Sequence, residues 1–221
     1  MQYPGGKGKT YQHIINLIPP HNTYIEAFLG SGAVLKNKLP ASRNIAIEIN
    51  KDVLNAFDSY SNDIELVNDD AIKYLIDFPF IGKEVVYCDP PYYPSTRYRK
   101  RVYRYDFNEK DHIELLNIIN ILPCRVLISG YDNDLYQEKL SAWSRYEFFA
   151  KTHKDRRKEI VWFNYPKPNA LHDNRYLGSN FRDRQNFKRR KERLKKRISR
   201  LSPPEIDEIL KWLTQERGRF E

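Results

Sequence analysis

Three features that mark other classes of protein are scarce in this chain of 221 residues. With only two cysteines, Cys88 and Cys124, neither a disulfide framework nor a cysteine-rich zinc site is available. The apolar runs are the size of strands, far below the roughly 18 residues that a membrane-spanning helix needs. The opening segment, MQYPGGKGKT, lacks the apolar core of a secretory leader. We therefore expect a cytoplasmic protein with no membrane contact and no bound metal.

Negative charge is also in short supply, because 38 Lys and Arg stand against 29 Asp and Glu, a net charge of +9. Residues 182–200 contain 11 basic and two acidic residues, so this one segment carries the whole excess. Such a run is either a solvated face or a docking surface for phosphates.

What is present is the alternating pattern of an α/β domain, in which short β-rich runs are separated by helix-length amphipathic runs. We predict a doubly wound α/β domain, in which helices cover both faces of a sheet. The expected strands are residues 24–28, 45–48, 84–88, 125–129, 146–150 and 160–165, and the expected helices are 32–38, 52–60, 109–122 and 133–140. Residues 1–175 are expected to form this domain. Residues 176–221 are expected to form a basic helical extension, in which Pro203 and Pro204 separate two helices.

The first glycine-rich segment, GGKGKT at residues 5–10, ends like a phosphate-binding P-loop. That motif requires a glycine where this chain has Tyr3, and it also requires a preceding strand. We therefore reject an ATPase. A glycine-rich turn that presents Lys7 to a cofactor remains possible.

A second glycine turn follows an expected strand, in YIEAFLGSGAV at residues 24–34. Glycines between a strand and a helix let the backbone approach a ligand closely. Glu48 ends the next expected strand, 18 residues after Gly30, near the spacing of about 20 at which an acidic side chain binds ribose hydroxyls. The pattern predicts a nucleoside site. The alternative is an ordinary tight turn beside a surface glutamate.

The third motif, VVYCDPPY at residues 85–92, delivers Asp-Pro-Pro-Tyr to the end of a buried strand. The prolines withdraw two N–H donors, so acceptors dominate this corner. An acidic side chain, fixed carbonyls and an aromatic ring are suited to a flat base that bears an amino group.

Together these motifs resemble the Dam-like (D12 class) DNA adenine-N6 methyltransferases, from Tyr3 to about residue 168. The matching elements are YPGGK, EAFLGSG, EIN, DPPY, FNEKDHIELL, VLISGYD and KEIVWFNYP, in that order. The resemblance implies a Rossmann-like methyltransferase fold, with a mixed sheet of about seven strands and helices on both faces, and the cofactor S-adenosylmethionine. The cofactor-binding residues that it implies are Tyr3, Lys7, Glu26, Phe28, Gly30, Gly32, Glu48, Asp70 and Asp89, with Asp69 an equal candidate for the place of Asp70.

The resemblance also implies the activity of a site-specific adenine-N6 DNA methyltransferase, with Asp89, Pro90, Pro91 and Tyr92 as catalytic residues. Asp89 and the Pro90 carbonyl would accept the two N–H bonds of an adenine flipped out of duplex DNA, and Tyr92 would stack on the base. His112 is expected to be structural. The Pro-Cys pair at Cys124 precedes a strand, so we reject the thiol nucleophile of cytosine methyltransferases.

One departure from the family bears on specificity. Only 40 residues separate Glu48 from Asp89, which leaves no room for a target-recognition insert. We expect short or relaxed specificity, with nucleic-acid contacts from the loop at residues 94–106 and from the basic tail. The candidate residues are Arg97, Tyr98, Arg99, Lys100, Arg101, Arg104, Lys188, Arg189, Arg190 and Lys191.

Two alternatives stay open. An RNA adenine-N6 methyltransferase would use the same corner, and the basic, aromatic loop also suits single-stranded RNA. A catalytically silent nucleic-acid-binding subunit is the other.

Overall fold

The computed structural model describes residues 6–57, 63–97, 104–151 and 156–217. The chain divides into two compact units, Met1–Asp173 and Asn174–Glu221. The predicted boundary after residue 175 falls close to this division, and the roles assigned to the two parts stay predictions. Among the helices so described, none has the length and apolar character needed to cross a membrane.

The first unit is built on a seven-stranded sheet in the order β3-β2-β1-β4-β5-β7-β6. The strands are β1 Thr23–Glu26, β2 Arg43–Ile47, β3 Glu65–Val67, β4 Glu84–Cys88, β5 Arg125–Gly130, β6 Ser144–Lys151 and β7 Arg156–Phe163. The first five run parallel, and β7 is antiparallel to both of its neighbours. This confirms the predicted Rossmann-like mixed sheet.

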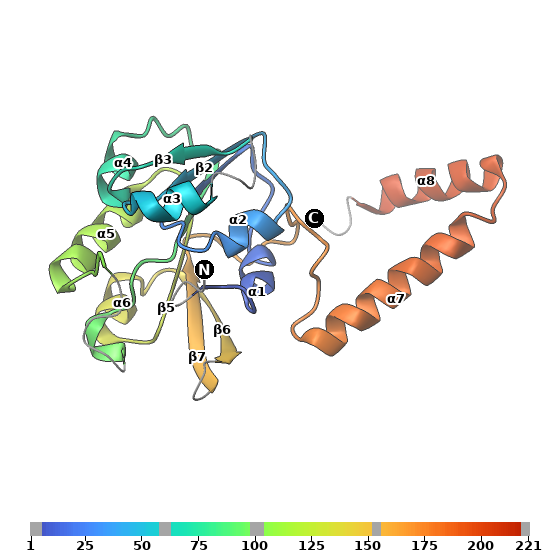
Figure 1. Cartoon of the computed structure of the whole chain (residues 1–221). Coiled ribbons are helices and arrows are strands. Elements are labelled where there is room, and N and C mark those ends of the chain that lie inside the picture. The colour runs from blue at the N-terminus through green and yellow to red at the C-terminus, as the bar shows by residue number, and fades with distance from the viewer. Residues whose placement is uncertain (1–5, 58–62, 98–103, 152–155, 218–221) are drawn as a thin grey trace. The chain divides into compact units, whose positions relative to one another are not determined.

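The central strands are buried on both faces, as parallel strands in an α/β sheet must be. All five residues of β4 are buried, and β5 is buried from its second residue onward. On one face, apolar side chains of the sheet form a single core with α4 Ala71–Asp77, α5 Glu109–Ile121 and α6 Asp134–Lys139. On the other face lie α1 Tyr11–Ile15 and α2 Ala33–Asn37 (Figure 1). The helices α4, α5 and α6 therefore cover the opposite side of the sheet from α1 and α2.

Side-chain caps mark where several helices begin. Asn108 and Asp111 form a capping box at α5, and Asn133 caps α6. Asp70 caps α4 by accepting the Lys73 N–H at 3.0 Å. The sequence analysis missed α1, α4 and β3, which are too short for their periodicity to stand out. The helix α3 Lys51–Phe57 begins as predicted, and its predicted end falls outside the described residues.

The described residues of the second unit, 174–217, form two helices, α7 Phe181–Ile198 and α8 Pro203–Arg217. Asn180 caps α7, and no side chain of that helix is buried. The two prolines lie in the first turn of α8. Backbone N–H groups there have no acceptor within the helix, so proline costs no hydrogen bond. This confirms the predicted basic helical extension.

Candidate active site

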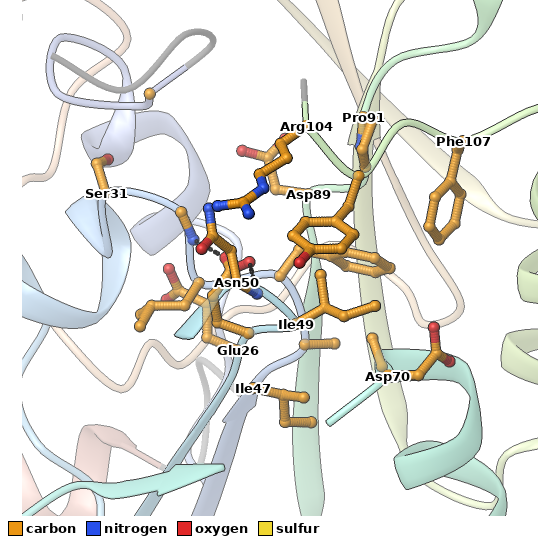
Figure 2. A pocket seen from close by; sticks show the side chains of 18 of the residues that line it. Glu26, Ser31, Ile47, Ile49, Asn50, Asp70, Asp89, Pro91, Arg104 and Phe107 are labelled. Carbon is orange, nitrogen blue, oxygen red and sulfur yellow. Dashed lines mark hydrogen bonds between the residues drawn. The ribbon is translucent and has the colours of Figure 1, made fainter. Parts of the chain in front are cut away.

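A cavity of about 360 Å³ opens at the carboxyl ends of β1, β2 and β4, the edge at which open α/β sheets bind ligands. Figure 2 shows that its walls come from the turn after β1, the segment after β2 and the Asp-Pro-Pro-Tyr corner after β4. Nine of the predicted site residues line it: Lys7, Glu26, Phe28, Gly30, Glu48, Asp70, Asp89, Pro91 and Arg104. The structure therefore brings together motifs that are far apart in the sequence.

The glycine turn between β1 and α2 is shaped by two left-handed residues, Gly30 with φ 49° and Gly32 with φ 60°. The backbone N–H of Leu29 donates to the Ile47 carbonyl at 3.0 Å, which ties the turn to β2. A Cβ atom on Gly32 would lie 2.2 Å from Cε2 of Phe57. Both the backbone conformation and the close approach of Phe57 thus require glycine at position 32.

Glu48 holds this turn in place from the end of β2. Its carboxylate accepts the Gly30 N–H at 3.0 Å and the Asn50 N–H at 2.9 Å, one on each oxygen. Burial raises the pKa of Glu48, although the backbone donors favour its charged form. Each oxygen keeps a lone pair that could accept a ligand hydroxyl.

Glu26 lies deeper, at the end of β1, and is 2% exposed. The Tyr24 hydroxyl donates to it at 3.0 Å. Burial raises the pKa of Glu26 to about 8. The carboxyl group is therefore largely protonated at neutral pH until a cation lies beside it.

The apolar wall of the cavity includes Phe28, whose ring lies edge-on to Phe107 with centroids 5.4 Å apart. Asp70 lines the cavity from the start of α4 (Figure 2), whereas the Asp69 carboxylate accepts the Asp70 N–H at 2.9 Å. The geometry thus favours Asp70 over Asp69 as a ligand contact.

The Asp-Pro-Pro-Tyr corner at residues 89–92 is organised around the ammonium group of Lys7. Its Nζ lies 2.7 and 2.8 Å from the two oxygens of Asp89, 2.8 Å from Oε1 of Glu159 and 2.5 Å from the Tyr92 hydroxyl. The Tyr92 hydroxyl also donates to Glu159. Lys7 is 4% exposed. The sequence analysis placed Lys7 on the cofactor; in the structure its charge is paired with the carboxylates of Asp89 and Glu159.

Burial and charge compete at this corner. Burial alone would lower the pKa of Lys7, but the carboxylates of Asp89 and Glu159 outweigh it and raise that pKa well above its ordinary value. Burial raises the pKa of Asp89; Lys7 opposes this shift and Glu159 adds to it. Burial likewise raises the pKa of Tyr92 well above its usual range. Lys7 is therefore charged and Tyr92 neutral.

Two residues at this corner were missed by the sequence analysis. Ser129, at the end of β5, donates to Oδ1 of Asp89 at 2.7 Å and lies 3.0 Å from the Tyr87 hydroxyl. Glu159 on β7 is 4% exposed. A glutamate directly before the apolar run IVWF was the available signal, because a buried charge needs a partner.

A layer of aromatic and basic side chains lies beside the corner. The rings of Tyr92 and Tyr131 meet edge to face with centroids 4.6 Å apart. The guanidinium carbon of Arg157 lies 4.1 Å from the Tyr131 ring centroid, and its Nη2 donates to the Thr96 carbonyl at 2.7 Å. These contacts tie β7 to the loop that follows Tyr92.

The predicted nucleic-acid contacts differ in their surroundings. Arg97 pairs with Asp106 and its side chain is 5% exposed, so it stabilises the loop instead of facing solvent. Arg104 is exposed, and its Nη1 lies 3.1 Å from Asp52. The four candidates on α7, Lys188, Arg189, Arg190 and Lys191, are all exposed. Tyr3, Tyr98, Arg99, Lys100 and Arg101 lie outside the described residues.

His112 and Cys124, which the sequence analysis set aside, are both buried. His112 lies 3.0 Å from the Tyr136 hydroxyl, and burial lowers its pKa to about 4. Burial raises the pKa of the Cys124 thiol to about 12. Neither group is suited to act as a nucleophile or base. In the parts of the chain covered by the structure, no cluster of His, Cys, Asp or Glu could hold a metal ion.

Comparison with known proteins supplies the family. A family model described as D12 class N6 adenine-specific DNA methyltransferase matches residues 3–78 and 71–154. No curated protein sequence matches the chain.

Several solved structures are similar in fold. A precorrin 8W decarboxylase from Methanobacterium thermoautotrophicum is 10% identical, with 74% of this chain and 93% of that one covered and a TM-score of 0.49. An rRNA methylase from Streptococcus thermophilus is 13% identical, with 74% and 97% covered and a TM-score of 0.46. Magnesium protoporphyrin IX methyltransferase from Synechocystis PCC 6803, with bound S-adenosylmethionine, is 11% identical, with 72% and 79% covered and a TM-score of 0.48. Scores this low carry no argument about function.

The family model spans well over half of the chain, and the matched region contains the glycine turn, Glu48, Asp70 and Asp89, which surround one cavity. This agrees with the resemblance found in the sequence. The chain belongs to the D12 class N6 adenine-specific DNA methyltransferase family.

Proposed function

We propose that this protein transfers a methyl group from S-adenosylmethionine to the N6 amino group of adenine in duplex DNA, as a site-specific adenine DNA methyltransferase. The observation that carries the proposal is that Asp89 of the Asp-Pro-Pro-Tyr corner lines the same cavity as Gly30 and Glu48. A methyl donor and an acceptor amine bound at these two places would be neighbours, and such proximity supplies much of the rate enhancement in a transfer of this kind.

The cavity suits S-adenosylmethionine, the methyl donor of this family, because its polar lining is mostly acidic. Glu26 would face the ammonium group, Glu48 the ribose hydroxyls and Asp70 the adenine amino group, while Ile49 offers an apolar surface that is 42% exposed. When bound, the cofactor supplies a methyl group already activated as a sulfonium, so the chain's task is positioning.

At the acceptor side, the target amine would replace the Lys7 ammonium on Asp89. Both groups present N–H donors, so Asp89 exchanges one set of hydrogen bonds for another. Asp89 and the Pro90 carbonyl accept from the amine, free its lone pair from the ring and stabilise the positive charge that develops on nitrogen. Tyr92 provides a neutral ring for stacking on the flipped base. Lys7 keeps Glu159 as its partner while Asp89 is engaged.

Contacts to the nucleic acid would come from segments that follow Asp89 in the chain, since no recognition insert precedes it. Arg104 beside the cavity and Lys188, Arg189, Arg190 and Lys191 on α7 supply exposed positive charge. The basic and aromatic residues Tyr98, Arg99, Lys100 and Arg101 would add to these. Phosphate contacts position a protein without reading sequence, so this arrangement favours short or relaxed specificity.

The test is incubation with methyl-labelled cofactor and unmethylated duplex DNA, beside Asp89→Ala, followed by analysis of the bases. We expect label on N6 of adenine with the wild-type chain and none with the variant. Cofactor binding by Asp89→Ala, measured by calorimetry, shows that the site is still formed. Label on cytosine, or label on structured RNA but not on DNA, would contradict the proposal.

A further inference from the structure

The hairpin β6–β7 extends beyond the rest of the sheet. These strands pair from Ser144↔Phe163 to Lys151↔Arg156, whereas β5 pairs with β7 only from Ile160 to Phe163. In the part of the chain that the structure describes, the four pairs from Phe148↔Glu159 to Lys151↔Arg156 have no third strand beside them. Because Gly130 at the carboxyl end of β5 pairs with Ile160, this ribbon projects past the edge that carries the active site (Figure 1).

The sequence at the end of the ribbon is basic, since residues 151–158, KTHKDRRK, contain five Lys or Arg and one Asp. Among the described side chains of this stretch, Arg157 and Lys158 supply the positive charge. Phe149 and Lys158 are directly opposite each other in the register and share a face of the ribbon, since cross-strand partners point to the same side. Phe149 is 60% exposed, and the Lys158 side chain is 49% exposed. This face combines an aromatic ring with a cation.

The ribbon is attached rigidly to the catalytic corner. Glu159, one residue after Lys158, accepts from the Tyr92 hydroxyl and pairs with Lys7 at 2.8 Å. Arg157 points to the other face of the ribbon, where it lies over Tyr131. Tyr131 packs on Tyr92 in turn. Lys158 points to the opposite face from Glu159, but it lines one open hollow together with Tyr131, so a molecule that touched Lys158 there would lie beside the ring that packs on Tyr92.

We propose that the β6–β7 ribbon docks in a groove of the substrate duplex next to the flipped adenine, an inference that rests on the proposed function. A two-stranded ribbon fits the major groove of B-form DNA, which is wide enough to admit it. Positive charge complements the phosphates that flank the groove. The ribbon thus supplies substrate contacts that a target-recognition insert would otherwise make.

The charge next to the ribbon limits where the duplex can lie. An open hollow of about 910 Å³ separates Lys158 from α6 and is lined there by Asp134 and Glu138. Carboxylates repel phosphates, so the DNA backbone is held on the ribbon side of this hollow. A second copy of this chain is a poorer occupant for the ribbon, because it would bring like charge against like charge.

Lys158 and Glu147 form an ion pair at 2.9 Å, so one substitution should weaken DNA binding and another should strengthen it. Lys158→Glu should raise the KM for duplex DNA about tenfold at 0.1 M salt, because one phosphate contact contributes nearly one unit to the slope of log K against log salt. Glu147→Gln should lower the KM about two- to fivefold, because it releases Lys158 from a surface ion pair. In both variants the kcat and the cofactor affinity should stay at wild-type values.

Lys83→Glu is the matched control, since Lys83 is exposed just before β4, at the opposite edge of the sheet. Its KM for DNA should stay within about twofold of the wild-type value, because salt screens a charge that lies far from the bound DNA. Wild-type activity on DNA with no change in KM for Lys158→Glu and Glu147→Gln would overturn the ribbon inference alone. An absence of wild-type activity on DNA would overturn the proposed function. A KM effect seen only with structured RNA would assign the ribbon to RNA and contradict DNA docking.

Discussion

The ammonium nitrogen of Lys7 lies 2.8 Å from Oε1 of Glu159 while it also pairs with Asp89 at 2.7 Å. One cation is thus shared by two carboxylates whose side chains are 5% and 17% exposed. An unpaired charge in such a place would be strongly destabilising. If a neutral amine takes the place of Lys7 on Asp89, Glu159 keeps the lysine paired, which makes Glu159 a positioning residue in the proposed reaction.

Glu159→Gln should therefore weaken the reaction without abolishing it. A glutamine can still accept from Tyr92, but of the two carboxylates that the structure pairs with Lys7 only Asp89 is left. Lys7 therefore binds Asp89 more strongly and the target amine displaces it less easily. We expect kcat/KM to fall about 10- to 100-fold, the range for loss of a charged hydrogen bond, mainly through KM.

The pH profile distinguishes this role from a purely structural one. Glu159 adds to the raised pKa of Asp89, so the acid limb of kcat/KM should move to lower pH in Glu159→Gln. Glu138→Gln, an exposed change on α6, should leave both limbs in place. An unchanged KM and profile for Glu159→Gln would contradict the role proposed for Glu159.

Asp89→Asn should remove methyl transfer while keeping the cofactor. The amide turns an acceptor into a partial donor toward Lys7 and Ser129, and it cannot stabilise positive charge on the amine. We expect single-turnover rates at least about 100-fold lower, comparable to losing one preorganised electrostatic contact. Asp69→Asn, beside the cavity but not implicated in catalysis by the geometry, is the control. A near-normal rate for Asp89→Asn would remove the basis of the mechanism.

The sequence was sufficient to predict which motifs would share the cavity. Gly30, Glu48 and Asp89 each follow a strand, and the carboxyl ends of parallel strands meet at one edge, so their proximity follows from topology alone. Which side chains of the loop at residues 94–106 are buried could not be predicted, because burial there depends on contacts that composition does not encode. Arg97 stands in a run of basic residues that suggests solvent exposure, yet its side chain pairs with Asp106 and is 5% exposed.

The Lys7–Glu159 pair could not be predicted in this way. It joins a residue before the first strand to one on an antiparallel strand 152 positions later. No local sequence pattern indicates that two residues so far apart in the chain will meet. The edge strand β3 was missed for a simpler reason, since its three residues are too few to show alternation. The strand β7 begins four residues before the predicted strand, so the sequence analysis also missed the extended β6–β7 ribbon.

Gly32→Ala tests the glycine turn. Alanine in a left-handed conformation costs roughly 1–2 kcal/mol, and its Cβ would lie 2.2 Å from Cε2 of Phe57. The turn must shift, so we expect a free energy of unfolding lower by about 1–3 kcal/mol and a cofactor Kd at least about tenfold higher. Gly8→Ala is the matched control, because no heavy atom lies within 4 Å of the Cβ it would add. Equal cofactor affinity in the two variants would show that the turn does not bind the cofactor.

The basic helix α7 should dominate the salt dependence of DNA binding. Changing Lys188, Arg189, Arg190 and Lys191 together to glutamine keeps helix propensity while removing four charges. If all four contact phosphates, the slope of log Kd against log salt should fall by about 3 to 4. Circular dichroism would confirm that the helix is retained. A slope equal to that of the wild type would mean that α7 is a solvated face.

Glu26 should make folding stability depend on pH in an unusual direction. Burial raises its pKa from 4.5 to about 8, so between these values the folded state holds a proton that the unfolded chain has released. Stability from this group is therefore complete below pH 4.5, declines as the pH rises toward 8 and is lost above it, by up to about 5 kcal/mol. Glu26→Gln has no proton to lose, so urea denaturation at pH 5, 7 and 9 should show the variant gaining on the wild type as the pH rises. Glu65→Gln is the contrasting control: the hydrogen bond from Arg43 lowers the pKa of Glu65, so the stability from this carboxylate is present above pH 4.5 and lost only at lower pH, and the difference between this variant and the wild type should stay constant from pH 5 to 9. A wild-type curve parallel to that of Glu26→Gln from pH 5 to 9 would show that Glu26 is charged throughout.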